Sequence, residues 1–276
     1  FTALCQTFGT MATGGFSTLN RSIGGFDNLY FDIVITVFML IAGANFALHY
    51  RMLKGNAGEL LKNREFRFYM SVFGIAVLFI TINTYFSVYK NIFQALRYAS
   101  FQVASIVTTT GYVTTDFEKW PPFSQMFLVL LMFIGGCAGS TGGSIKCVRI
   151  MLLLKHIKKG LKQLIHPHGV FTVKLGGQAV APDVMNGVLS FFLLYMVLFI
   201  IGSLIMSFLG MDQVTALTSV AACIGNIGPG LGGVGPTDHY AGIPHLGKWV
   251  LIFLMFVGRL EVYSIILLLV PDFWKK

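Results

Sequence analysis

Three short loops rich in glycine and threonine separate apolar segments of this sequence. Aligned on the last glycine of each, they read Met11-Ala12-Thr13-Gly14, Thr108-Thr109-Thr110-Gly111 and Gly225-Asn226-Ile227-Gly228. Glycine permits backbone conformations in which successive carbonyl groups point the same way, and threonine hydroxyls add further oxygens. Rings of such oxygens replace the hydration shell of a cation in selective filters. One such loop could equally be a surface turn, but three in register predict the walls of a cation filter.

The composition is that of an integral membrane protein. The 276 residues are 55% hydrophobic and only 11% charged, whereas a soluble domain carries about 25% charged residues. Segments long enough to cross a lipid bilayer need about 20 mostly apolar residues. They are predicted at residues 29–48, 68–89, 123–154 (interrupted), 188–209 and 246–270.

Each glycine-containing loop follows a helix too short to span the bilayer. These helices are predicted at residues 1–10, 91–107 and 212–224, the last with Asp212 as its N-cap. Their C-terminal ends carry partial negative charge, which favours a cation at the loop. The repeated unit is therefore a span, a short re-entrant helix, a filter loop and a second span.

The basic residues define the orientation in the membrane. Lysine and arginine gather at residues 49–67 and 146–174 and at the C-terminal Lys275 and Lys276. By the positive-inside rule these segments, including the C-terminus, are cytoplasmic. The formal net charge of +9 is then a property of the topology, and no nucleic-acid partner is expected. The basic cluster at residues 155–159 is either a solvated face or a contact with anionic lipid.

A glycine-rich run interrupts the third predicted span. It comprises Gly135, Gly136, Cys137, Ala138, Gly139, Ser140, Thr141, Gly142 and Gly143. Nine residues of poor helix propensity should unwind the middle of the span, and unwound backbone there needs a wet cavity or protein cover. Close helix packing without any further role is the alternative reading.

Arg259 lies in the middle of the last predicted span. A charge at that depth is costly unless it is paired or faces water, so Arg259 is a candidate functional residue. A structural ion pair with Glu261 is the alternative, but residues two apart on a helix do not face each other. We therefore expect Glu261 to meet a different helix.

Other polar residues receive simpler interpretations. The four cysteines, Cys5, Cys137, Cys147 and Cys223, are predicted to be buried free thiols. Asp32 is expected to reach the membrane interface, and the segment His166-Pro167-His168 to form a turn rather than a metal site. No hydrolase motif or paired carboxylates are present, so a membrane-embedded enzyme is an unlikely alternative and the chain is predicted not to be an enzyme. A structural membrane subunit would not need three matched loops.

Five motifs together resemble the TrkH family of the Trk/Ktr/HKT superfamily of potassium transporters. They are V-T-T-T-G-Y, A-T-G-G-F-S-T, G-N-I-G-P-G-L-G, G-G-C-A-G-S-T-G-G-S-I-K and G-R-L-E-V-Y. The resemblance implies a potassium-channel-like fold, in which units of this kind surround one pore with pseudo-fourfold symmetry. Residues 1–50 would form part of the second unit, residues 66–155 the third and residues 185–272 the fourth. The first unit would lie upstream of this chain.

The resemblance also implies roles and partners. The three loops would bind potassium, residues 135–143 would form a gate loop that obstructs the pore, and Arg259 would be a positive barrier below the filter. The protein would take up potassium across the bacterial inner membrane, as a homodimer on a cytosolic TrkA-type ring that binds NAD or ATP. The ring would dock on residues 51–67 and 155–174, and this chain would bind no nucleotide itself. Potassium symport, sodium-coupled or sodium-permeable transport and ammonium passage are the alternatives within the same class.

Overall fold

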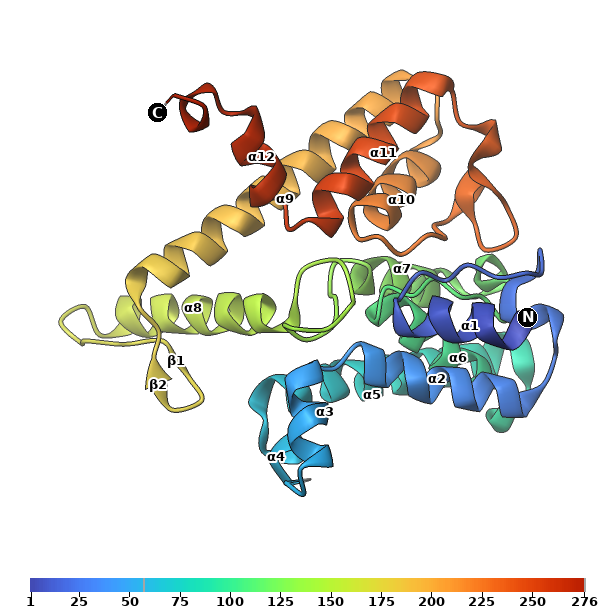
Figure 1. Ribbon diagram of the computed structural model, residues 1–276, viewed down its shortest axis with the longest axis horizontal. Helices are drawn as coiled ribbons and strands as arrows, with labels where there is room; N and C mark the ends of the chain where they lie inside the picture. Colours follow the sequence, from blue (N-terminus) through green and yellow to red (C-terminus); the bar gives the residue numbers. More distant parts are fainter. Residues whose placement is uncertain (57, 276) are drawn as a thin grey trace.

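The computed structural model describes residues 1–56 and 58–275, and it confirms the predicted all-α class (Figure 1). Lys276, part of the predicted basic C-terminus, lies outside the described residues. The helices are α1 (Thr2–Met11), α2 (Leu29–Ala42), α3 (Phe46–Leu53), α4 (Gly58–Lys62), α5 (Arg64–Thr84), α6 (Ile92–Val107), α7 (Pro122–Leu131), α8 (Cys147–Ile165), α9 (Pro182–Phe208), α10 (Gln213–Ile224), α11 (His245–Arg259) and α12 (Tyr263–Leu269). Within the described residues, the only strands are β1 (Lys174–Leu175) and β2 (Gln178–Ala179), which pair as a small hairpin.

Short helical turns lie between these helices and after α12. They are η1 (Ser22–Gly25), η2 (Tyr85–Tyr89), η3 (Phe117–Lys119), η4 (Gly232–Val234), η5 (Tyr240–Gly242) and η6 (Pro271–Phe273). The three predicted short helices are confirmed as α1, α6 and α10. The predicted N-cap is also confirmed, because the Asp212 carboxylate accepts a hydrogen bond from Thr215 N at 3.1 Å.

Two of the predicted spans are continuous helices. By length and composition, residues 64–89 and 182–208 could each cross a membrane, which agrees with the predictions at 68–89 and 188–209. The interruption predicted within residues 123–154 is also present, since α7 ends at Leu131 and α8 begins at Cys147.

The other two predicted spans are not continuous, so those predictions are wrong in detail. Helices α2 and α3 meet at an angle of 101° within the segment predicted as one span at residues 29–48. The Asn45 side chain accepts from Ala47 N at 2.8 Å and so starts a new helix there. The last span breaks between α11 and α12, where Glu261 and Val262 have positive φ angles of 57° and 37°.

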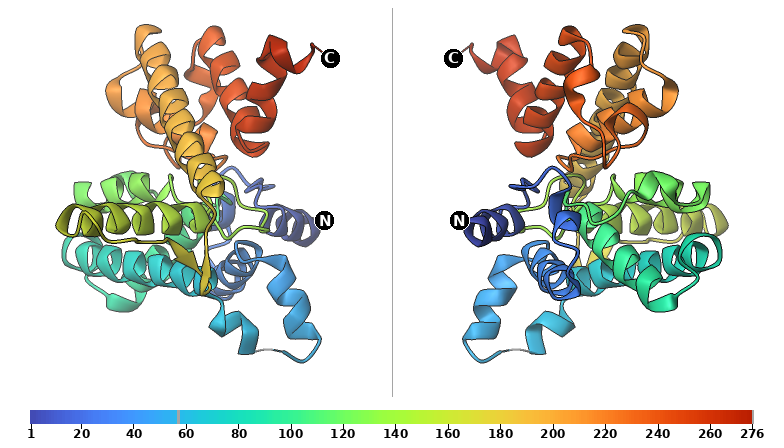
Figure 2. Two further views of the ribbon diagram at one scale, coloured as in Figure 1. Left: turned by 90° about the vertical axis from the view of Figure 1, so that its left-hand side faces the viewer. Right: turned by 90° about the vertical axis from the view of Figure 1, so that its right-hand side faces the viewer.

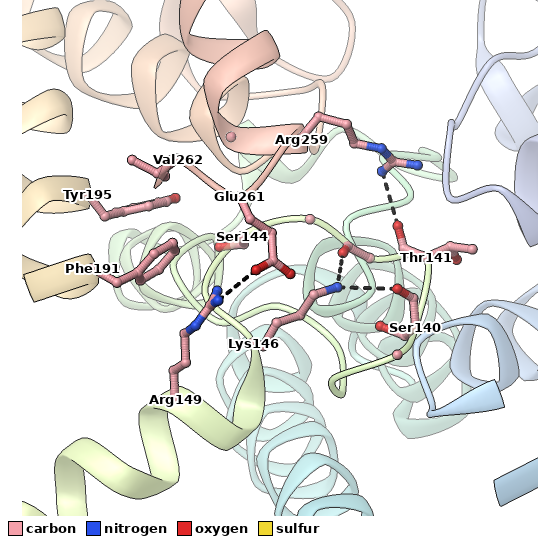
Figure 3. A pocket seen from close by; sticks show the side chains of 14 residues that line it. Ser140, Thr141, Ser144, Lys146, Arg149, Phe191, Tyr195, Arg259, Glu261 and Val262 are labelled. Carbon is pink, nitrogen blue, oxygen red and sulfur yellow. Dashed lines mark hydrogen bonds and ion pairs between the residues drawn. The ribbon is translucent and has the colours of Figure 1, made fainter. Parts of the chain in front are cut away.

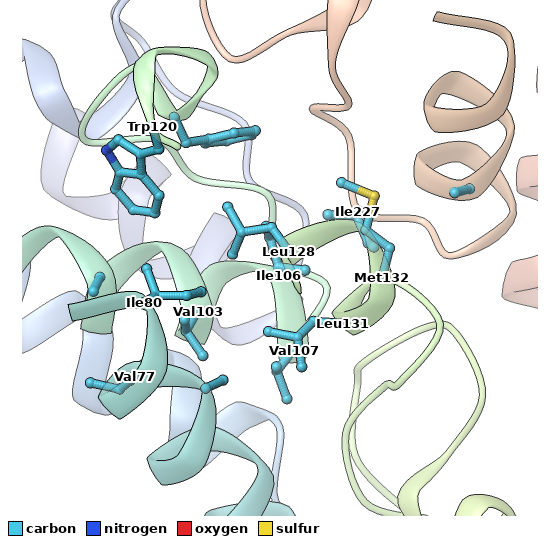
Figure 4. Packing of buried hydrophobic residues seen from close by; sticks show 14 of the residues in the cluster. Val77, Ile80, Val103, Ile106, Val107, Trp120, Leu128, Leu131, Met132 and Ile227 are labelled. Atoms are coloured by element: carbon cyan, nitrogen blue, oxygen red, sulfur yellow. The ribbon is translucent and has the colours of Figure 1, made fainter. Parts of the chain in front are cut away.

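The helices form two bodies that α8 and α9 connect (Figures 1 and 2). Helices α1–α7 make one body, and α9–α12 make the other. The first has its core between α5, α6 and α7, and the second between α9, α10 and α11. Ile227, from the loop after α10, reaches into the first core and lies beside Met132 (Figure 4). The loop after one short helix is therefore part of the packing of the neighbouring body.

A buried ion pair joins α2 to the short helix α6. Asp32 is only 3% exposed, and its carboxylate lies 2.7 Å from Arg97 Nε. Asp27 lies 3.4 Å from the same guanidinium. The expectation that Asp32 reaches the interface is therefore wrong, because Arg97, which is 65 residues away in the sequence, satisfies its charge inside the protein.

This pair predicts strong coupling between Asp32 and Arg97. Asp32→Asn or Arg97→Gln alone leaves a desolvated partner charge and should cost about 3–5 kcal/mol of stability at most, because such a charge is expensive to bury unpaired. The double variant should lose clearly less stability than the sum of the two single losses. Thermal unfolding of the purified variants measures this, and strictly additive losses would contradict the pairing.

Candidate functional site

The loop after α6 has a backbone pattern that recurs in the other two loops. Thr109 adopts the left-handed conformation with φ 57°, and Gly111 follows with φ 83°. The amide groups of Thr110 and Gly111 both donate to the Ser105 carbonyl, at 2.8 and 3.3 Å. Two successive amides thus turn back onto the last turn of the short helix.

The loop after α1 repeats this pattern. Thr13 is left-handed with φ 50°, Gly15 has φ 65°, and the amides of Gly14 and Gly15 donate to the Gly9 carbonyl at 2.8 and 3.3 Å. The loop after α10 has the same two positive φ angles and the first of the two amide bonds. Asn226 has φ 55°, Gly228 has φ 114°, and Ile227 N donates to the Ala222 carbonyl at 2.8 Å.

These matches correct the predicted alignment of the first loop by one residue. Gly15, rather than Gly14, is the counterpart of Gly111 and Gly228, and Met11 is the last residue of α1. The equivalent segments are therefore residues 12–15, 108–111 and 225–228. The sequence could not distinguish two adjacent glycines, because the distinction lies in which of them has the positive φ.

The three loops lie against one another through these glycines. A Cβ atom at Gly15 would overlap the carbonyl oxygen of Thr110, and a Cβ at Gly111 would overlap the carbonyl oxygen of Ile227. Each carbonyl thus occupies the space that a side chain on the preceding loop would need. Among the described residues, no atom lies within 4 Å of a Cβ placed at Gly228.

The left-handed residues hold the loops to the segments beneath them. Thr13 Oγ1 donates to the Thr141 carbonyl at 2.9 Å, and Thr109 Oγ1 accepts from Gly143 N at 2.6 Å. Asn226 Nδ2 donates to the Met255 carbonyl of α11 at 3.0 Å. These side chains anchor the loops, whereas the sequence had suggested that threonine hydroxyls extend a column of oxygens.

The glycine-rich run, residues 135–143, lies directly under the ends of all three short helices. Thr141 Oγ1 donates to the Met11 carbonyl at 3.1 Å, at the end of α1. A Cβ at Gly142 would lie 3.1 Å from the Thr108 carbonyl oxygen, and one at Gly143 would overlap the Gly225 carbonyl oxygen. The run is also tied to the α2–α3 bend, since Cys137 N donates to the Gly43 carbonyl at 2.8 Å. The unwound segment is therefore packed against protein on this side, while Gly139 remains exposed.

Arg259 points toward the run and the first loop (Figure 3). Its guanidinium donates to the Thr141 carbonyl at 3.0 Å and to the Ala12 carbonyl at 3.3 Å. Glu261 instead pairs with Arg149 of α8 at 2.7 Å. The alternative pairing of Arg259 with Glu261 is thus excluded in this structure, and the expectation that Glu261 meets another helix is confirmed.

A cavity of about 330 Å³ lies below the run, lined by three cationic side chains and one carboxylate. Lys146, Arg149 and Arg259 supply the positive charges, and Glu261 supplies the negative charge (Figure 3). The Lys146 ammonium donates to the carbonyl groups of Ser140 and Gly142. The excess of positive charge disfavours a cation at this position unless the groups move.

Sequence reasoning missed two residues that hold the site together. Lys146 was assigned to a cytoplasmic basic loop, but it folds back onto the run. Glu65 was not singled out, although its carboxylate accepts a hydrogen bond from Ala138 N within the run. No pattern in the sequence marks either residue. Glu65 meets Ala138, 73 residues away, and the bonds of Lys146 form only because the unwound segment turns back toward it.

Outside the membrane segments, Glu118 of η3 connects the two bodies. Its carboxylate accepts a hydrogen bond from Gly232 N of η4. Burial raises the pKa of Glu118, the hydrogen bond from Gly232 opposes this shift, and the nearby Asp116 and Asp238 add to it. This contact holds the segments that follow the second and third loops side by side.

One thiol takes part in the site, since Cys147 Sγ donates to the Gly135 carbonyl at 3.1 Å, at the start of the run. All four cysteines are free; Cys137, Cys147 and Cys223 are buried as predicted, but Cys5 is partly exposed. His166 lies at the end of α8, in a turn. The described residues contain no group of three or more histidine, cysteine or carboxylate side chains placed to hold a metal ion.

Comparison with known proteins agrees with the resemblance drawn from the motifs. A family model described as "TrkH: Cation transport protein" matches residues 1–276. The Trk system potassium uptake protein TrkH of Escherichia coli (strain K12) is 39% identical over 278 residues, and that of Vibrio parahaemolyticus serotype O3:K6 is 40% identical over 281 residues. Each alignment covers 100% of this chain and 57% of the relative.

A solved structure also matches. The crystal structure of the potassium transporter TrkH from Vibrio parahaemolyticus has a TM-score of 0.93 and 38% sequence identity. The match covers 99% of this chain and 59% of that chain. The chain therefore spans somewhat more than half the length of these relatives.

The corrected alignment predicts different costs for two adjacent glycines. Gly15→Ala forces alanine into a left-handed conformation, which costs roughly 1–2 kcal/mol, and also overlaps the Thr110 carbonyl. Gly14→Ala meets only the Phe16 ring at 3.3 Å, without a positive φ, and should be tolerated better. Thermal unfolding of both variants measures the difference, and a larger loss for Gly14→Ala would refute the corrected register.

Proposed function

This chain belongs to the TrkH family of cation transport proteins, and on that premise we propose that it forms part of a potassium uptake pore in the membrane. The relatives described above are named as potassium uptake proteins. The observation that carries the proposal is the arrangement of the three loops, which share a pattern of positive φ angles and an amide bond back to the preceding helix. At Gly15 and Gly111 a carbonyl of the next loop packs against the glycine.

Potassium is the transported ion in this proposal, and the loops form its selectivity filter. Residues 12–15, 108–111 and 225–228 supply backbone carbonyls that replace the hydration shell of the ion. The short helices α1, α6 and α10 end at these loops, so their partially negative C-terminal ends favour a cation there. No carboxylate is needed in such a filter.

The glycine-rich run acts as the gate in this proposal, and we call residues 135–143 the gate loop from here on. It lies under the ends of all three short helices and is bonded to two of the three filter loops. An ion that leaves the filter toward the cytoplasm would meet this backbone first. Transport would therefore require the gate loop to move.

Arg259 adds an electrostatic barrier to the steric one. Its guanidinium lies between the gate loop and the first filter loop, where it donates to a carbonyl of each. With Lys146 and Arg149 it gives the cavity below the gate loop an excess of positive charge. Such a field opposes a cation more strongly at low local dielectric than in water.

The basic segments define the proposed topology and partner surface. The C-terminal end of α8, the β1–β2 hairpin and the C-terminus lie at the same end of the molecule, on the left in Figure 1. We place this end in the cytoplasm of a bacterial inner-membrane protein, by the positive-inside rule. Residues 51–67 and 155–174 are the proposed docking faces for a TrkA-type ring that binds NAD or ATP, with the protein acting as a homodimer. This chain itself would bind no nucleotide.

The filter assignment predicts altered selectivity when a side chain replaces a filter glycine. Gly111→Ser and Gly228→Ser should each lower the preference for potassium over sodium, because both residues have positive φ and shape the carbonyl rings. A tenfold loss corresponds to about 1.4 kcal/mol of relative binding. Gly111→Ser should also be less stable, since its Cβ overlaps the Ile227 carbonyl.

Potassium and sodium flux into liposomes containing the full-length protein measures this selectivity. Gly210→Ser, at a positive φ in the turn after α9 with open space around it, is the matched control and should leave the ratio unchanged. Unchanged ratios at both filter positions in folded protein would rule out the filter assignment.

The barrier assignment predicts that Arg259→Ala raises potassium flux severalfold. Arg259→Lys should stay nearer to the wild type, because it keeps the charge while losing the planar fork. The structure leaves no carboxylate unpaired when Arg259 is removed, since Glu261 pairs with Arg149. Flux per folded molecule is the measurement.

Arg149→Ala serves as the contrasting variant for Arg259→Ala. It removes a positive charge from the same cavity but deprives Glu261 of its partner, so it should lower thermal stability more than Arg259→Ala does. An Arg259→Ala protein that is both slower and less stable than wild type would contradict the barrier role.

A further inference from the structure

Glu65 joins two segments that lie on opposite sides of the turn made by the gate loop. It lies in the first turn of α5, and its Oε1 atom accepts hydrogen bonds from Ala138 N at 2.7 Å and from Val148 N at 3.1 Å. Ala138 belongs to the gate loop, and Val148 lies in the first turn of α8. One carboxylate oxygen therefore connects the outgoing and returning parts of the chain.

The neck of the gate loop is also held by bonds of its own, among them one from the Cys147 thiol to the Gly135 carbonyl at 3.1 Å. Gly135 N donates to the Ile145 carbonyl at 2.9 Å, and Cys147 N donates to the Gly136 carbonyl at 3.0 Å. These bonds close the neck but do not attach it to any spanning helix. Glu65 supplies an attachment to α5, which is one of the continuous spans.

Glu65 also caps the N-terminal end of α8. The first amides of a helix lack partners within the helix and need a cap. The N-cap residue of α8 is Lys146, whose side chain makes no capping hydrogen bond. A carboxylate at this end satisfies a free amide and interacts favourably with the helix dipole.

The anchoring of α5 makes Glu65 a fixed point. Tyr69, one turn further along α5, is fully buried and lies in the main core cluster. Its hydroxyl donates to the Leu40 carbonyl of α2 at 3.3 Å. A carboxylate carried by a helix packed in this way restrains whatever it binds.

We propose that Glu65 is a positioning residue that holds the gate loop in its obstructing conformation by clamping Ala138 and Val148 to α5. The inference rests on the proposed gate function of residues 135–143. Charge-assisted bonds to a carboxylate are stronger than those to a neutral acceptor. The restraint should therefore weaken in the order Glu65, Glu65→Gln, Glu65→Ala.

The accessibility of Cys137 reports on the clamp independently of ion flux. Cys137 is the residue before Ala138 and is only 1% exposed. The full-length protein with Cys137 as its single cysteine is reacted with a membrane-impermeant thiol reagent from the cytoplasmic side. Glu65→Ala should raise the labelling rate about tenfold or more, and Glu65→Gln should give an intermediate rate, because about 1.4 kcal/mol of lost restraint corresponds to a factor of ten.

Two controls separate the clamp from general loosening. Glu59→Gln removes a carboxylate of α4 that pairs with Arg51, with both side chains exposed, and it should leave labelling unchanged. A second background keeps only Cys223, which is buried in α10 at 5% exposure. Its labelling rate should not respond to either change at Glu65.

The outcomes distinguish the clamp from the gate. Faster labelling of Cys137 alone, with potassium flux raised in the same order and an unchanged potassium-to-sodium ratio, supports both. Faster labelling without a rise in flux supports the clamp but contradicts the gate role. Unchanged labelling of Cys137, or an equal increase at Cys223, overturns the clamp. If Glu65→Ala does not fold, the comparison of Glu65→Gln with Glu59→Gln decides in the same way.

Discussion

The constraint on which this structure depends is that backbone groups at membrane depth must find partners inside the protein. The chain leaves the helical conformation at each filter loop, through the gate loop and at the two bent spans. At every filter loop an amide turns back to the last turn of the preceding helix, as Thr110 N does to Ser105. In the gate loop the partners come from the filter, from α2 and from Glu65. The hydrogen-bonding groups of the irregular segments thus find partners in the helices and loops around them.

Close approach between these segments follows from that constraint and explains the glycines. A backbone carbonyl can pack directly against a neighbouring loop only where no side chain intervenes. At Gly15 and Gly111 the carbonyl of the next filter loop fills the place of a Cβ, and at Gly143 the carbonyl of Gly225 does so. The filter and the gate loop are therefore one packed unit, in which a change in either is felt by the other.

The charged groups at depth follow the same logic. Asp32 pairs with Arg97, and Glu261 with Arg149. Among the described residues no carboxylate lies within hydrogen-bonding distance of Arg259 or Lys146, and both donate to carbonyls of the unwound backbone instead. These two cations hold the unwound backbone in place, and in the proposed pore they would also oppose an ion beneath it. The charges that hold the unwound backbone in place are thus also those proposed to regulate passage.

The sequence by itself determined the all-α membrane class, the short helices before each loop and the interruption at residues 135–143. Those features depend on local composition, since long apolar segments, capping residues such as Asp212 and runs of glycine act over a few neighbours. The tertiary structure alone decided that Gly15 and not Gly14 matches Gly111, that the spans bend near Asn45 and Glu261, and that Asp32 is buried. It also decided the partners of Glu65 and Glu261. Apart from the bend near Asn45, where the cap is local, these features depend on contacts between residues far apart in the chain, and such contacts leave no periodic signal in one sequence.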